Sequence, residues 1–372
     1  MNNPNRVAVV ACAQTELRPA WSGAQHVDLI SATVSALLKG SGVALADVDF
    51  VIDSGSDVLD GRSISNCGFL GAMGAHHKEE SRVEEDGLWA ASYGVNKIAA
   101  GAAELGVIIA YSKPSESDVS LFYASQVEPF YQRPVGFDHV AACGLQAQQY
   151  LVRGGARAAD FARVVARSWR QAARNPHVAG TQTLTEDEID AGAYVAAPLR
   201  RHMISRPLDG CVAVLLAGAA VARRMTAQPV WVTGMGAAMD SHAFAVRAPG
   251  RVEACEVAAK AAYARAGLDP RSAAIAEVSG ASAAGEMMVL EALGLAAPGQ
   301  GFAAYAGATA INLSGGALPA DPIMATGLVR LAEAWRQMTQ PADYGLAGVN
   351  SAIVHATGGV GMQSHCVFTL EV

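Results

Sequence analysis

Apolar positions along the chain alternate between short β-branched runs and longer stretches with one apolar residue every three or four positions. This arrangement occurs twice. The first copy opens with the strand-like run RVAVVACAQTEL from Arg6, and the second opens with PVWVTGMGAAMD from Pro229. An amphipathic helix follows each run and ends near a glycine, the usual residue just past a helix end. The predicted helices are 29–38, ending near Gly42, and 257–266, ending near Gly267.

The later parts of the two copies also correspond. The matched strands are 48–52 with 274–278, 107–111 with 348–354, and 212–217 with 366–370, and the matched helices are 90–105 with 325–338. Strand–helix–strand units at this spacing predict parallel strands joined by right-handed crossovers. We expect an α/β fold of five layers, α-β-α-β-α, built from an N-terminal half (1–225) and a C-terminal half (226–372). A loop domain at about 112–206, with a long helix near 161–174, is inserted into the first half.

Composition narrows the class of protein. The chain has 372 residues, of which 51% are hydrophobic and 16% charged, and its net charge is −7. So few charges suit a chain that covers part of its surface with a partner. There is no basic run that would bind a nucleic acid and no apolar run of about 18 residues that would span a membrane. The N-terminus reads as a first strand, and the six cysteines form no CxxC pair. We therefore expect a cytoplasmic protein without a metal in this chain.

Five strings carry a family resemblance. They are GLQAQQYLVRGGARAADFARVVARSWRQAARNPHVAG from Gly144, RPLDGCVAVLLAG from Arg206, EVSGASAAGEMMVLEALGL from Glu277, NLSGGALPADPIMATG from Asn312 and HATGGVGMQSHCVFTLE from His355. In this order and spacing they resemble the thiolase superfamily, and within it the sterol-carrier-protein-2-type thiolases and their lipid-transfer-protein relatives. The resemblance covers nearly the whole chain and implies a thiolase-like fold, coenzyme A thioesters as substrates, and at least a dimer.

The positions at which that family carries its reactive groups hold other residues here. The nucleophilic cysteine matches Gly87 in VEEDGLWAASYG, with Asp86 before it. The His-Asp-Cys-Phe motif matches the small residues that begin at Ser279. The catalytic histidine of a Gly-His-Pro turn matches Asp321. Acyl transfer through a covalent intermediate needs an activated nucleophile, so ordinary thiolysis is not expected.

The remaining candidates have both a structural and a chemical interpretation. Asp86 caps a helix or lines a pocket, and Asp321 caps a turn or acts as an acid or base. His355 opens the last glycine-rich loop, either as a structural hydrogen-bonding residue or as a general base or donor. By resemblance, the amides of that loop receive an oxyanion, which makes Gly359 a catalytic candidate. The candidate substrate-binding residues are Asp86, Gly87, Ser279, Asn312, Ser314, Gly358 and Gly361.

Four arginines are spaced along the long helix of the loop domain. They are Arg163, Arg167, Arg170 and Arg174, and the i, i+4, i+7, i+11 spacing places them on one face. This face is either a solvated basic surface or a site for the phosphates of coenzyme A.

Three functions remain open. The leading hypothesis is an acyl-CoA enzyme that makes or breaks a C–C bond without a cysteine nucleophile, as an aldolase-type lyase working with a small OB-fold subunit, with or without zinc. The partnership and the lyase activity are what the resemblance implies. The second hypothesis is a catalytically silent subunit in a heteromer with an active thiolase-like chain. The third is an acyltransferase with a relocated nucleophile such as Cys67 or Cys143.

Overall fold

A ten-stranded sheet forms the frame of the computed structural model, which describes residues 5–340 and 344–372. The strand order is β10-β9-β11-β12-β8-β1-β7-β4-β2-β3. The N-terminal half contributes β1 (Val7–Gln14), β2 (Phe50–Ser54), β3 (Glu79–Val83), β4 (Leu105–Ser112) and β7 (Gly210–Gly218). The C-terminal half contributes β8 (Val230–Met239), β9 (Ile275–Glu277), β10 (Ala310–Ile311), β11 (Ser351–Gly358) and β12 (Ser364–Glu371).

The strand order repeats in the two halves. Taken in chain order, the first, second, third, fourth and fifth strands of each half lie in the spatial order 3-2-4-5-1. The two halves join where β1 pairs with β8 in antiparallel fashion. This repeat of order is the structural counterpart of the repeat of hydrophobic pattern.

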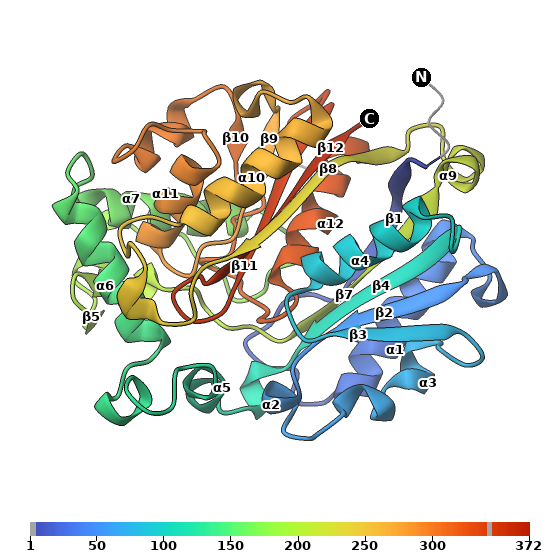
Figure 1. The fold of residues 1–372 in the computed structure, drawn as a ribbon, viewed down its shortest axis with the longest axis horizontal. Coiled ribbons are helices and arrows are strands. Elements are labelled where there is room, and N and C mark those ends of the chain that lie inside the picture. The colour runs from blue at the N-terminus through green and yellow to red at the C-terminus, as the bar shows by residue number, and fades with distance from the viewer. Residues whose placement is uncertain (1–4, 341–343) are drawn as a thin grey trace.

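Helices separate and cover the two halves of the sheet (Figure 1). The buried clusters show three helical layers: α1 (His26–Ser41) and α9 (Ala219–Met225) on the outer face of the first half, α4 (Gly87–Ala99) and α12 (Thr326–Thr339) between the halves, and α10 (Glu253–Ala266) and α11 (Ala283–Ala292) on the outer face of the second. The expected five-layered α/β fold is therefore confirmed.

The inserted region contains α5 (Val119–Ser125), α6 (His139–Val152), α7 (Ala158–Ala172), α8 (Glu186–Asp190) and the short hairpin of β5 (Tyr194–Ala196) and β6 (Leu199–Arg200). Its helices α6 and α7 share a hydrophobic cluster with α10 and α11. The insertion therefore belongs to the first half in sequence but packs on the second half in space. Two short helices, α2 (Asp57–Asp60) and α3 (Leu70–Met73), complete the first half.

Some local predictions need correction. The helix expected at 90–105 starts at Gly87 and stops at Ala99, because the chain turns at Gly101 with φ +76° before β4 begins at Leu105. The sheet is mixed, since β7 and β12 run antiparallel to their neighbours. In the described part of the chain, no helix combines the length and the apolar character that a membrane crossing requires.

Candidate active site

A cavity of about 430 Å³ lies where the N-termini of α4 and α12 meet. Its walls include the start of α4, the start of α12, the α5–α6 part of the insertion and the loop between β11 and β12, together with residues at α2, at the end of β8 and after β9. The N-termini of α4, from the first half, and of α12, from the second half, therefore lie at the same cavity. A helix start carries free N–H groups and a partial positive charge, so this space suits negatively charged groups.

Asp86 is held between these two helix starts. It is 4% exposed and lines the cavity. Its Oδ1 accepts a hydrogen bond from Leu88 N at 2.9 Å, and its Oδ2 accepts one from Gly327 N at 2.8 Å. Leu88 is the second residue of α4 and Gly327 the second of α12. The sequence interpretation of Asp86 as a helix cap is confirmed, and the carboxylate also caps a second helix from the other half.

Burial raises the pKa of Asp86 to about 7. The loss of solvation is the largest cause, and the nearby charges of Glu85 and Asp321 raise the pKa further. The two backbone N–H groups act in the opposite direction but do not cancel the effect of burial. A carboxyl group that is half ionised near neutral pH is suited to exchanging protons with a ligand.

Asp321 lines the same cavity from the turn before α12. Its Oδ2 accepts a hydrogen bond from Ser205 Oγ at 2.6 Å, and its Oδ1 accepts one from Thr326 Oγ1. Burial raises the pKa of Asp321, and the two hydroxyl groups lower it in part. Because Thr326 and Gly327 are consecutive and bond to the two different carboxylates, the first turn of α12 fixes Asp321 and Asp86 together.

The loop between β11 and β12 forms another wall of the cavity. Gly358 and Gly359 line it, and so does Ser279. Ser279 Oγ accepts a hydrogen bond from Thr357 N at 3.2 Å and donates to His355 O at 3.3 Å. Gly359 has φ +71°, a conformation that favours glycine. Gly361 and Gly87 are buried beside this region but are not part of the cavity wall.

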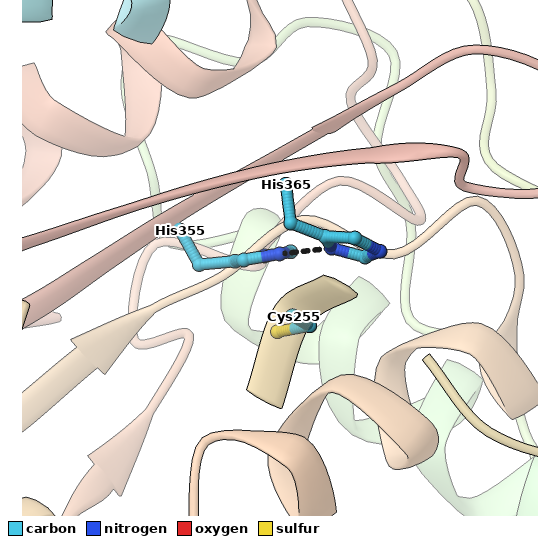
Figure 2. Close-up of side chains that lie close together, drawn as sticks. All are labelled: Cys255, His355 and His365. Atoms are coloured by element: carbon cyan, nitrogen blue, oxygen red, sulfur yellow. Dashed lines mark hydrogen bonds between the residues drawn. The ribbon is translucent and has the colours of Figure 1, made fainter. Parts of the chain in front are cut away.

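His355 does not open the loop, which corrects its expected position. It lies inside β11, is 0% exposed, and is absent from the cavity wall. Its Nε2 forms a 2.9 Å hydrogen bond with His365 Nδ1 on β12 (Figure 2). Burial lowers the pKa of His355 well below its ordinary value. A neutral imidazole inside the sheet cannot reach a ligand in the cavity, so the structure does not support His355 as the base.

Figure 2 also shows Cys255 beside this histidine pair. In the described part of the chain, these three are the group whose donor atoms lie close enough for a metal ion, within 4.8 Å of one another. The contacts do not favour a metal. The two histidines already bond to each other, His365 Nε2 bonds to Met362 O at 3.0 Å, and burial raises the pKa of the Cys255 thiol. The pair is best described as a brace between β11, β12 and the loop that joins them.

Asn312 and Ser314 also lie outside the cavity, contrary to their expected role. Both are almost fully buried. Asn312 Oδ1 accepts a hydrogen bond from Val278 N at 2.7 Å. Ser314 belongs to a buried ion-pair network: its Oγ donates to Glu277 Oε2 at 2.6 Å and accepts from Arg330 Nη1 at 2.6 Å. These polar side chains hold the segment in place and do not face a ligand.

The arginine face on α7 is largely used for internal contacts. Arg163 pairs with Asp160 at 3.2 Å, and Arg167 Nη2 donates to Ile311 O at 2.7 Å. Arg170 and Arg174 are exposed, and the helix ends at Ala172, before Arg174. Arg163 is therefore engaged in an ion pair and Arg167 in a backbone hydrogen bond, and none of the four arginines lines the cavity described above.

Sequence reasoning missed several groups on the cavity wall. Glu85 is half-buried and accepts from Ser364 Oγ at 3.1 Å, and burial raises the pKa of Glu85. Tyr123 and His139 come from the part of the insertion that precedes the string beginning at Gly144, so none of the five resembling strings includes them. The signal for His139 was its position directly after Asp138, an aspartate that starts α6. No cysteine is among the residues that line the cavity in the described part of the chain.

Comparison with known proteins finds thiolase-like proteins by sequence and by structure. Residues 218–371 match the family model described as "Thiolase C-terminal domain-like". The chain is 26% identical to "Acetyl-CoA acetyltransferase" of Methanothermobacter thermautotrophicus, over 95% of this chain and 97% of the relative. It is 24% identical to "17-hydroxy-3-oxo-4-pregnene-20-carboxyl-CoA lyase" of Mycobacterium tuberculosis, over 91% of this chain and 93% of the relative. The solved structure of the "Ltp2-ChsH2(DUF35) aldolase" superposes with a TM-score of 0.82 at 21% identity, covering 99% of this chain and 98% of that one.

The fold, the repeated strand order and these matches define a thiolase-like protein of the acyl-CoA-handling kind. The family model matches the C-terminal part of the chain, and the chain's relatives include a full-length acetyl-CoA acetyltransferase and sterol carrier protein 2, so these matches support the predicted resemblance to the thiolase superfamily and its sterol-carrier-protein-2-type branch. Asp86 and Asp321 line the cavity at the helix starts, and none of its described lining residues is a cysteine.

Proposed function

We propose that this protein cleaves a C–C bond in a β-hydroxyacyl-CoA without forming a covalent acyl-enzyme. The observation that carries the proposal is the pair Asp86 and Asp321 at the two helix starts, in a cavity whose described lining holds no cysteine. A thioester exchange needs a nucleophile, whereas an aldol cleavage needs only a base, an acid and a site that stabilises negative charge on oxygen.

The proposed reaction assigns a role to each carboxyl group. Ionised Asp86 accepts the proton of the β-hydroxyl group, and the Cα–Cβ bond breaks. The β-carbon leaves as an aldehyde or ketone, and the electron pair passes to the α-carbon and the thioester oxygen as an enolate. Protonated Asp321 returns a proton to the α-carbon and releases the shortened acyl-CoA. The opposed roles require two carboxyl groups in different protonation states, which their different partners favour.

The relatives support this reaction class and a second chain. One is named a lyase that acts on an acyl-CoA, and the structural neighbour is an aldolase that contains Ltp2 together with ChsH2(DUF35). We propose that this chain also acts in a complex, with either a small subunit of the kind expected from the sequence or another thiolase-like chain. Two apolar side chains on the insertion, Phe130 and Tyr131, are about 80% exposed to solvent. This exposure is consistent with a surface that a partner covers.

A relocated cysteine nucleophile is disfavoured by the burial of the candidates. Cys143 is 0% exposed, and burial raises the pKa of its thiol to about 12. Cys67 is exposed but is not on the cavity wall. A thiol must ionise and reach the thioester to act as a nucleophile.

The decisive experiment incubates the complex, purified from its native host, with a β-hydroxyacyl-CoA and detects the aldehyde or ketone and the shortened acyl-CoA by mass spectrometry. The proposal expects both products, and it expects Asp86→Asn to lower kcat by about 10²-fold or more, the usual contribution of a general base. Cleavage that is unchanged in the double variant Asp86→Asn, Asp321→Asn would show that this chain is a silent subunit. The absence of cleavage over a panel of acyl groups would contradict the proposed reaction.

A further inference from the structure

His139 lines the cavity from helix α6 of the insertion, whereas Asp86 and Asp321 line it from the segments before α4 and α12. Asp138 Oδ1 accepts a hydrogen bond from Ala141 N at 2.7 Å and so starts α6, which makes His139 the first residue of that helix. Its imidazole is 7% exposed and stacks on the ring of Tyr123, with centroids 3.9 Å apart and an interplanar angle of 10°. Both rings line the cavity, and the charge of Asp321 raises the pKa of Tyr123, so the stack lies near the proposed acid.

The hydrogen bonds of His139 are incomplete. Nε2 lies 3.8 Å from the Sγ atom of Cys143, one helical turn later. Nδ1 is buried and has no partner among the described residues. Ser282 also forms a hydrogen bond with the Cys143 thiol. Because burial keeps this thiol protonated, it can donate its S–H to Nε2, and the ring proton of a neutral His139 then sits on Nδ1.

The charge state of this imidazole follows from its surroundings. Burial lowers the pKa of His139 to about 4, and the charge of the preceding Asp138 raises it only in part. The ring therefore stays neutral at pH values near 7. A neutral imidazole can donate a hydrogen bond to an oxygen that gains negative charge while keeping its own proton.

We infer that His139 donates a hydrogen bond from Nδ1 to the thioester oxygen of a bound acyl-CoA, and that Cys143 is the positioning residue that fixes its tautomer. A buried donor without an acceptor is uncommon in folded proteins, and a ligand oxygen in the adjoining cavity supplies the missing acceptor. The inference rests on the proposed function and deepens it. Asp86 and Asp321 act on the β-carbon and α-carbon, while His139 receives the charge that develops on the oxygen.

The test uses a ligand that cannot be cleaved. Butyryl-CoA labelled with ¹³C at the thioester carbon is bound to the protein in its native complex, and binding is measured by calorimetry. Infrared difference spectra then report the C=O stretch. A donor to the oxygen lowers this frequency, so we expect a downshift in the unaltered protein. We expect it to be lost in His139→Phe, which keeps the ring stack with Tyr123, and in His139→Leu. His139→Gln, which keeps a neutral N–H donor, retains part of the downshift.

Two cysteine variants separate the positioning role from a packing role. Cys143→Ser keeps a donor to Nε2 and preserves the downshift, whereas Cys143→Ala releases the tautomer and weakens it. Cys255→Ala is the matched control, because it also removes a buried thiol beside a histidine but lies away from the cavity. It leaves the downshift unchanged.

The outcomes distinguish this inference from the proposed function. If the downshift survives in His139→Phe and His139→Leu, or if butyryl-CoA does not bind, the inference is wrong. If the downshift depends on His139 but no β-hydroxyacyl-CoA is cleaved, the proposed reaction fails and the donor role stands. If cleavage occurs, kcat in His139→Phe falls by about 10²-fold while KM changes little, the pattern for a donor used in the transition state.

Discussion

Asp86 gives the sharpest physical prediction, because its burial couples the stability of the protein to pH. The folded-state pKa of about 7 lies above the ordinary value of 3.8. The folded protein therefore binds this proton more tightly than the unfolded chain does. The resulting stabilisation is complete below pH 4 and is lost as the pH rises through 7.

The size of the effect follows from the two pKa values. A change from 3.8 to about 7 corresponds to about 4 kcal/mol of unfolding free energy, since one pKa unit corresponds to about 1.4 kcal/mol. Of this, roughly 2 to 3 kcal/mol falls between pH 5 and pH 8. In Asp86→Asn the titrating group is gone. One of the two N–H groups loses its acceptor, which costs about 1 to 3 kcal/mol, but that cost does not depend on pH.

The assay is urea unfolding of the unaltered protein and of Asp86→Asn at several pH values from 5 to 8. We expect the free energy of unfolding of the unaltered protein to fall relative to that of the variant by roughly 2 to 3 kcal/mol over this range. Asp118→Asn is the control. It replaces an exposed cap of α5, where the side chain accepts from Leu121 N at 2.9 Å, and its curve should run parallel to that of the unaltered protein. Parallel curves for Asp86→Asn as well would refute the assigned pKa.

Three further predictions follow from the site. The rate of C–C cleavage should rise with pH and reach half its maximum near pH 7, where Asp86 ionises, and a rate independent of pH from 5 to 9 would exclude Asp86 as the base. Gly87→Cys should not create a thiolase and should lower the free energy of unfolding by about 1 to 3 kcal/mol, because a Cβ atom there lies 2.7 Å from the Cβ atoms of Ala110 and Leu328. Gly40→Ala is the control, because a Cβ atom at Gly40 meets no atom within 4 Å. An unchanged melting temperature for Gly87→Cys would contradict the packing argument. Iodoacetamide should modify the exposed Cys67 without loss of cleavage, as seen by peptide mass spectrometry, whereas inactivation that tracks one modified thiol would restore the cysteine hypothesis.

The cavity also shows which site assignments a linear pattern can support. Asp86 and Asp321 were found because each occupies a motif position at a helix start, and both starts meet in space. His355 was misplaced because its glycine-rich neighbours suggested a loop, although β11 extends through it to Gly358. The arginines of α7 shared a face, as their spacing required, but spacing could not show that Asp160 and Ile311 O already occupy that face.

The sequence alone determined the duplicated α/β plan and the loss of the family's sulfur and imidazole groups, because hydrophobic period and motif identity are local properties of the chain. Only the tertiary structure decided which groups share the cavity. Asp86 and Gly327 are 241 positions apart, and His139 comes from an insertion that matches no catalytic motif. Their protonation also depends on burial, which is set by the packing of both halves around the helix starts and cannot be read from any one segment.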